Sequence, residues 1–121
     1  MSYAAIISRE LRECAWACHE CKDACLELLP HCLEQGGEFA DGRYLLLLVD
    51  CAQICGVAEE FMHRGSARHH HACLACAEVC EQCAEACDRL NGGDGLIRRC
   101  AGACHECARA CRVMCSDYDP R

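Results

Sequence analysis

Apolar and sulfur-bearing side chains recur along the chain at alternating intervals of three and four residues. The stretch CLACAEVCEQCAEAC, residues 73–87, shows this spacing with five cysteines. A repeat of about 3.5 residues keeps side chains on one face of an α-helix. Strand-like alternation is not evident. Glycine-rich stretches interrupt the repeat at residues 35–43, 64–68 and 91–95. The pattern therefore predicts four helices, over residues 3–33, 43–63, 68–90 and 95–117.

The connections between these helices are short, which favours antiparallel neighbours. We therefore predict an all-α fold, an antiparallel up-down-up-down four-helix bundle that forms a single domain over residues 1–121. Pro30 is expected to kink or end the first helix, because proline cannot donate the helical hydrogen bond. The third helix is acidic and the fourth is rich in arginine. The fourth helix is therefore expected to lie between the first and the third.

Heptad assignment shows which side chains these helices turn inward. We call the row of a and d positions the seam. Leucine, isoleucine and tyrosine take seam positions near the helix ends, for example Ile7, Tyr44 and Tyr118. Cys115 falls on a flanking e position. The other sixteen of the seventeen cysteines lie on the seam: Cys14, Cys18, Cys21, Cys25, Cys32, Cys51, Cys55, Cys73, Cys76, Cys80, Cys83, Cys87, Cys100, Cys104, Cys107 and Cys111.

Composition and charge exclude several classes of function. The net charge of −7 argues against a nucleic-acid partner, which needs a basic face. No apolar run is long enough for a transmembrane helix. The stretch MSYAAIISRELREC does not resemble a signal peptide. We therefore expect a cytoplasmic protein. No nucleophile–base pair, phosphate loop or carboxylate dyad is visible, so an enzyme is not expected.

Two readings of the cysteines involve no metal. Free cysteine packs as a small hydrophobe, which explains one or two buried thiols but not sixteen on one seam. Interhelical disulfides need oxidising conditions and suitable geometry at many sites. Cysteine-rich chains in a reducing compartment more often bind metal. We therefore interpret the seam as a set of metal ligands.

Soft thiolates select Cu(I), Zn(II) or iron–sulfur clusters. Zinc needs discrete tetrahedra of four ligands, and four thiolates around Zn(II) leave two negative charges. Such charges are costly in a closed core. One Cu(I) per thiolate leaves the core neutral, and a continuous row of thiols suits bridging coordination. The CxxC pairs lie within helical heptads, without the βαβ pattern of a thioredoxin-like motif.

The segments CAWACHECKDAC (14–25) and CAGACHECARAC (100–111) present the same face on two helices. A bundle lined by CxxxCxxCxxxC helices resembles the bacterial copper storage proteins, in particular their cytosolic branch. This resemblance covers the whole chain. It implies many Cu(I) ions inside the bundle, bound mainly by paired cysteines, and assembly into a homotetramer.

The two ends of the predicted bundle differ. Leucines and Ile97 are expected to seal one end. The other end collects potential copper ligands, and we expect ions to pass there: Met62, His63, His69, His70, His71, Met114 and Cys115. Among these, His69 lies on the seam and is the best histidine candidate. Met62 and Met114 face inward, as ligands or as packing. His63, His70 and His71 lie off the seam.

The remaining histidines receive other assignments. His19 and His105 are expected at the solvated surface, and His31 is left without a role. Trp16 lies off the seam, in a subunit interface or on the surface. The apolar run LLLLV, residues 45–49, favours additional burial, for example between protomers.

The sequence therefore predicts a cytosolic store of many Cu(I) ions that binds its cargo and performs no turnover. Three alternatives stay open: a zinc buffer like metallothionein, an iron–sulfur electron carrier, and a copper chaperone with one or two ions. The sequence identifies no copper enzyme or chaperone that exchanges metal with it.

Overall fold

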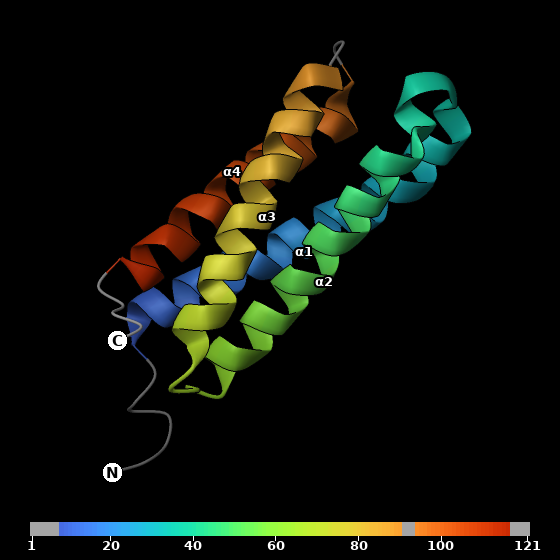
Figure 1. The fold of residues 1–121 in the computed structure, drawn as a ribbon. Helices are drawn as coiled ribbons and strands as arrows, with labels where there is room; N and C mark the ends of the chain where they lie inside the picture. Colours follow the sequence, from blue (N-terminus) through green and yellow to red (C-terminus); the bar gives the residue numbers. More distant parts are fainter. Residues whose placement is uncertain (1–7, 91–93, 117–121) are drawn as a thin grey trace.

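The computed structural model describes residues 8–90 and 94–116 (Figure 1). The helices are α1 (Arg9–Gln35), α2 (Gly42–His63), α3 (His69–Leu90) and α4 (Gly95–Cys115), with a short 3-10 helix, η2 (Gly37–Ala40), between α1 and α2. The predicted all-α four-helix bundle is confirmed. The predicted ranges of α2, α3 and α4 agree with the observed ones within two residues. Helix η2 was not predicted.

Helix α1 differs from its predicted range at both ends. It begins at Arg9, because the Ser8 side chain accepts a hydrogen bond from the backbone N–H of Leu11 and caps the helix. The predicted residues 3–7 lie outside the described chain. The helix ends at Gly36, whose φ of 70° suits glycine and whose N–H donates to the carbonyl of Cys32.

The helix does not end at Pro30, so that part of the prediction is wrong. Pro30 lies inside α1 and on its exposed side. Its ring leaves the carbonyl of Leu26 without a helical donor. Leu26 is also exposed, and water can satisfy that carbonyl. The helix therefore continues and places Cys32 inside the core.

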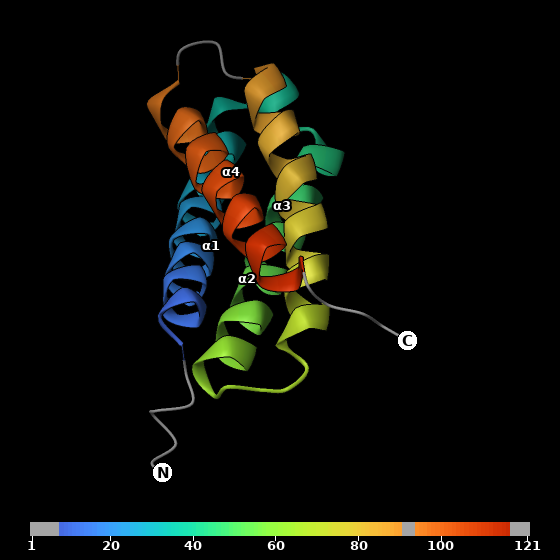
Figure 2. The ribbon, with the colours of Figure 1, turned by 90° about the vertical axis from the view of Figure 1, so that its left-hand side faces the viewer.

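The helices form a ring in which each contacts its two neighbours, and α4 lies between α1 and α3 as predicted. Figures 1 and 2 show the start of α1, the turn between α2 and α3, and the end of α4 at the same end of the bundle. Arg112 of α4 donates two hydrogen bonds to the carboxylate of Glu81 on α3. Arg99 of α4 pairs with Glu27 of α1. The expected charge complementarity is therefore present on both sides of α4.

The core consists of cysteine and alanine along most of its length. Larger buried side chains lie toward the ends, namely Tyr44, Leu28, Leu48, Ile97 and Met62. No charged side chain is buried among the described residues. Alanine beside cysteine allows the helices to approach closely. As a result, the centre of the bundle is filled by sulfur atoms from all four helices.

Candidate metal centre

All sixteen seam cysteines are buried, with at most 1% of each residue exposed. The helical period explains this, because positions three and four apart turn the same face of each helix inward. All seventeen cysteines are free thiols. Sγ atoms on different helices lie in contact, from 3.5 Å between Cys21 and Cys104 to 4.0 Å between Cys18 and Cys76. Thiols from all four helices therefore form a connected row in the interior.

The thiols divide into overlapping groups of four whose Sγ atoms all lie within 4.8 Å of one another. Each consecutive pair of the following groups shares two cysteines, and we call this series the thiol ladder. Its groups are, in order, Cys18, Cys76, Cys107 and Cys111; Cys55, Cys76, Cys80 and Cys107; Cys21, Cys51, Cys55 and Cys80; Cys21, Cys25, Cys51 and Cys104; Cys25, Cys83, Cys100 and Cys104.

The overlap has a chemical consequence. A tetrahedral Zn–S₄ site has sulfur–sulfur edges of about 3.8 Å, so the distances alone are compatible with zinc. Isolated zinc tetrahedra, however, need cysteines that belong to one site each. In the thiol ladder most cysteines belong to two groups. The arrangement therefore favours ions that accept few ligands and bridging sulfurs.

Two buried thiols near Tyr44, those of Cys32 and Cys87, favour the protonated form. Burial raises the pKa of the Cys32 thiol, and the nearby Asp94 carboxylate adds to the effect. The contacts of Cys87 with Cys100 and Cys83, together with burial, raise the pKa of Cys87. Because no cation is buried among the described residues, an arriving metal ion must itself supply the charge that balances each thiolate.

One end of the bundle carries the predicted neutral ligands. Met62 is buried, and its Sδ accepts a hydrogen bond from the thiol of Cys73 at 3.6 Å. The Nδ1 of half-buried His69 lies 2.8 Å from the carbonyl of Ser66. A carbonyl can only accept, so Nδ1 carries the proton and Nε2 keeps a lone pair for a metal ion.

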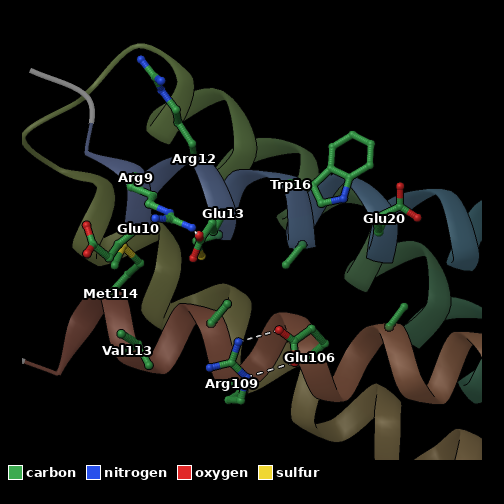
Figure 3. A pocket seen from close by; sticks show the side chains of 14 residues that line it. Arg9, Glu10, Arg12, Glu13, Trp16, Glu20, Glu106, Arg109, Val113 and Met114 are labelled. Carbon is green, nitrogen blue, oxygen red and sulfur yellow. Dashed lines mark hydrogen bonds and ion pairs between the residues drawn. The ribbon is translucent and has the colours of Figure 1, made fainter. Parts of the chain in front are cut away.

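Met114 lies at the same end, on the surface between α1 and α4. A groove of about 720 Å³ runs there, and Met114, Cys14 and Val113 are among the residues that line it (Figure 3). The Sγ of Cys14 is 3.6 Å from that of Cys111, which belongs to the first group of the thiol ladder. Met114 is partly buried against the core and shares this groove with Cys14.

The opposite end is apolar, as predicted. Leu28, Leu48 and Ile97 are buried there, and three further side chains are partly buried against the core: Phe39, Leu45 and Leu90. The hydroxyl of Tyr44 is 3.2 Å from the Sγ of Cys87. Sequence reasoning placed Tyr44 on the seam but gave it no role. The sequence did contain a signal for this contact, because Tyr44 shares the seam with cysteines and leucines.

Not all predicted candidates join the ladder. Cys115 is only partly buried, and its thiol donates to the carbonyl of Arg112 in its own helix. Cys32 is buried beside Tyr44 rather than within the groups of the ladder named above. His63 and His71 are exposed, and the rings of His70 and His69 contact each other in a tilted arrangement, with centroids 4.0 Å apart.

The other histidines make specific contacts. His105 is exposed, as expected, and pairs with Asp88 at 2.9 Å. His31, which had no predicted role, lies 2.7 Å from Asp94, the N-cap of α4. His19 is half-buried against α2 rather than simply solvated, because Glu59 lies 3.2 Å from its Nδ1. Trp16 is 63% exposed.

A four-helix bundle whose interior is a continuous row of free thiols defines a class of soft-metal-binding helical proteins. Residues 7–116 match the copper storage protein family along nearly the whole sequence, and the chain belongs to that family. In the described part of the chain, no helix combines the length and the apolar character that crossing a bilayer requires.

Solved structures share both the fold and part of the sequence. The Cu(I)-bound form of the copper storage protein BsCsp3 is 31% identical, with a TM-score of 0.81 over 88% of this chain and 99% of its own. The Nmul_A1745 protein of Nitrosospira multiformis is 37% identical, with a TM-score of 0.83 over 89% of this chain and 96% of its own.

A curated relative has a more limited match. The cysteine-rich protein YhjQ of Bacillus subtilis is 32% identical over 68 residues, which are 56% of this chain and 63% of that protein.

Proposed function

We propose that this protein stores many Cu(I) ions in the core of its bundle, with the seam cysteines as thiolate ligands. The observation that carries the proposal is the thiol ladder, in which consecutive groups of four share two cysteines. A continuous set of shared sulfurs provides sites along the whole interior rather than at one position. This favours a store over a copper chaperone, which holds one or two ions.

Charge supports Cu(I) over zinc as the cargo. Each Cu(I) that replaces one thiol proton leaves the core neutral, whatever the number of ions bound up to one per thiol. Four separate zinc sites with four thiolates each leave eight negative charges in an interior with no buried cation among the described residues. Membership of the copper storage protein family and the likeness to Cu(I)-bound BsCsp3 support the same choice.

The ligands fall into two sets. The sixteen buried cysteines hold the stored ions, with Cys32 at the sealed end. Met62, His69, Met114 and Cys115 act at the open end, where ions enter and leave. Thioether and imidazole bind as neutral ligands, so they receive Cu(I) without first losing a proton in the way a thiol must.

The protein binds its cargo and performs no catalysis in this proposal. It acts in the cytoplasm, where the reducing environment keeps thiols free. It assembles into a homotetramer, and the exposed side chains of Trp16, Leu33 and Leu46 supply apolar surface for contacts between protomers. Light scattering on the purified chain tests the assembly, and cell fractionation tests the location.

An anaerobic titration of the reduced protein with Cu(I), against a chromogenic chelator, tests the storage function. We expect uptake to continue well beyond two ions per chain and the loaded protein to be colourless. A plateau at one or two ions contradicts storage. Displacement of Cu(I) by zinc at controlled free concentrations indicates a zinc buffer, and visible absorption with acid-labile sulfide indicates an iron–sulfur protein.

A further inference from the structure

A second group of metal-ligand side chains lies on the outer surface of α1 and α2. Its centre is Glu59, which is 14% exposed. Glu59 Oε2 is 3.2 Å from the Nδ1 of His19 and 3.4 Å from the Nε2 of His63. Glu59 and His63 are one helical turn apart on α2, while His19 comes from α1. Two imidazoles on different helices thus approach one carboxylate oxygen.

The two distances are compatible with a bound metal ion as well as with hydrogen bonds. Both exceed the usual N–H···O length of about 2.9 Å. Zinc binds imidazole nitrogen and carboxylate oxygen at about 2.0–2.1 Å, so the edge of its tetrahedron is about 3.3 Å. The two observed separations, 3.2 and 3.4 Å, lie on either side of that edge. The two edges that meet at the carboxylate oxygen therefore fit a tetrahedral zinc site.

The neighbouring Lys22 leaves the Oε2 atom of Glu59 available to a metal ion. Lys22 donates to the other carboxylate oxygen, Oε1, at 3.2 Å. Partial burial raises the pKa of Glu59, but Lys22 and His19 lower it below its ordinary value overall, so the carboxylate is ionised. The Nε2 of His19 lies 3.9 Å from the carboxylate of Asp23, one helical turn further along α1.

We propose that His19, Glu59 and His63 form a surface site for a divalent transition-metal ion of the zinc type, with water at the open fourth position. The donor set is two imidazoles and one carboxylate, which suits borderline divalent ions, whereas thiols select Cu(I). The site is separate from the thiol ladder, because its side chains lie outside the core. It gives the protein a second class of metal ligand, independent of the stored copper.

Trp16, the only tryptophan of the chain, provides a direct readout. Its ring stacks on the imidazole of His19, with centroids 5.4 Å apart and 19° between the planes. A paramagnetic ion bound to His19 lies close enough to quench the fluorescence of Trp16. Co²⁺ is a suitable probe because it accepts tetrahedral nitrogen and oxygen ligands in place of zinc.

The test uses the full chain with its thiols already filled by Cu(I), so that Co²⁺ does not bind in the core. The copper content is measured first, and a chain that fails to take up copper counts against the storage function alone. We expect Co²⁺ to quench Trp16 with a one-to-one endpoint, and Zn²⁺ to restore the fluorescence. Absence of quenching overturns the proposal, and the cluster is then an ion-pair network only.

Variants locate the site. His63→Ala removes one ligand from an exposed position and leaves the Trp16–His19 stack in place, so its basal fluorescence should be unchanged. We expect this variant and Glu59→Gln each to weaken Co²⁺ binding by at least about tenfold. His105→Ala is the matched control, since His105 is an exposed histidine that pairs with Asp88. Equal quenching in His63→Ala and the native chain contradicts the assignment.

Discussion

The Sγ atoms of Cys21 and Cys104 lie 3.5 Å apart, although 83 positions separate the two residues in the chain. Cys21 comes from α1 and Cys104 from α4. Each belongs to two of the overlapping groups of the thiol ladder, and one of those groups contains both. The pair therefore connects successive groups, and the loss of either thiol affects more than one potential ion position.

Cys21→Ala should lower the copper capacity. We expect the variant to bind about one Cu(I) ion fewer, and about two fewer where the Cys21 thiolate bridges two ions, because Cu(I) is held by shared thiolates. Cys115→Ala is the matched control, since Cys115 is only partly buried and bonds to its own helix. The anaerobic chelator titration measures both variants. An unchanged endpoint for Cys21→Ala contradicts a role for the ladder in storage.

The positions of the seam cysteines could be predicted from the sequence because they depend on helical period alone. Once the helices form, side chains three and four apart share a face, and sixteen thiols must point the same way. The end of α1 could not be judged in the same way. Whether Pro30 ends a helix depends on whether water reaches the freed carbonyl of Leu26, which is a property of the folded surface.

Contacts between helices could not be predicted either. The pairs Tyr44–Cys87, His31–Asp94 and His19–Glu59 join residues on different helices or at a helix start. Such contacts depend on the axial shift and rotation of one helix against another. A heptad pattern leaves these quantities open, because it specifies which face turns inward but not which residues meet at its edges.

His69→Ala should slow copper uptake without changing the amount of copper held at the end. The hydrogen bond from His69 Nδ1 to Ser66 leaves Nε2 available at the open end of the bundle. Loss of a transient ligand worth about 1.4 kcal/mol at the barrier slows uptake about tenfold. Stopped-flow transfer from a Cu(I) chelator measures the rate, with His105→Ala as the control. A reduced endpoint would instead place His69 among the storage ligands.

Asp94→Asn should destabilise the bundle at neutral pH. Asp94 accepts from the backbone N–H groups of Leu96 and Ile97 and pairs with His31 of α1. His31, followed by the N–H of Ile97, lowers the pKa of Asp94 below its ordinary value of 3.8. Asparagine still caps a helix, so the variant tests the charge rather than the cap.

The pH dependence of this effect has a definite sign. Because the folded-state pKa is lowered, the stability that Asp94 contributes is present above pH 3.8 and is lost as the pH falls through the folded-state pKa. The difference in melting temperature between the native chain and Asp94→Asn should therefore close in acid. Asp50→Asn, at an exposed position of α2, is the control. A difference that persists at the lowest pH contradicts the charge interaction.

The reduced, metal-free bundle should be folded at neutral pH and should lose stability in alkali. Protonated thiols pack as small hydrophobes, so the core needs no metal to exclude water. Burial raises the pKa of Cys32 above its ordinary value of 9.0, and contacts with other thiols together with burial raise that of Cys87. A thiol whose pKa is raised by folding contributes stability that is fully present below pH 9.0. That contribution is lost as the pH rises through the folded-state pKa, at about 1.4 kcal/mol per pH unit for each thiol.

Circular dichroism during chemical unfolding at a series of pH values measures this dependence. The midpoint for the metal-free chain should fall between pH 8 and pH 10, since ionisation favours the unfolded state, where water reaches the thiolates. The Cu(I)-loaded chain should change little over the same range, because Cu(I) binding has already displaced the thiol protons into the solvent. A metal-free chain that is unfolded at pH 7, or whose midpoint rises with pH, contradicts the protonated, close-packed core.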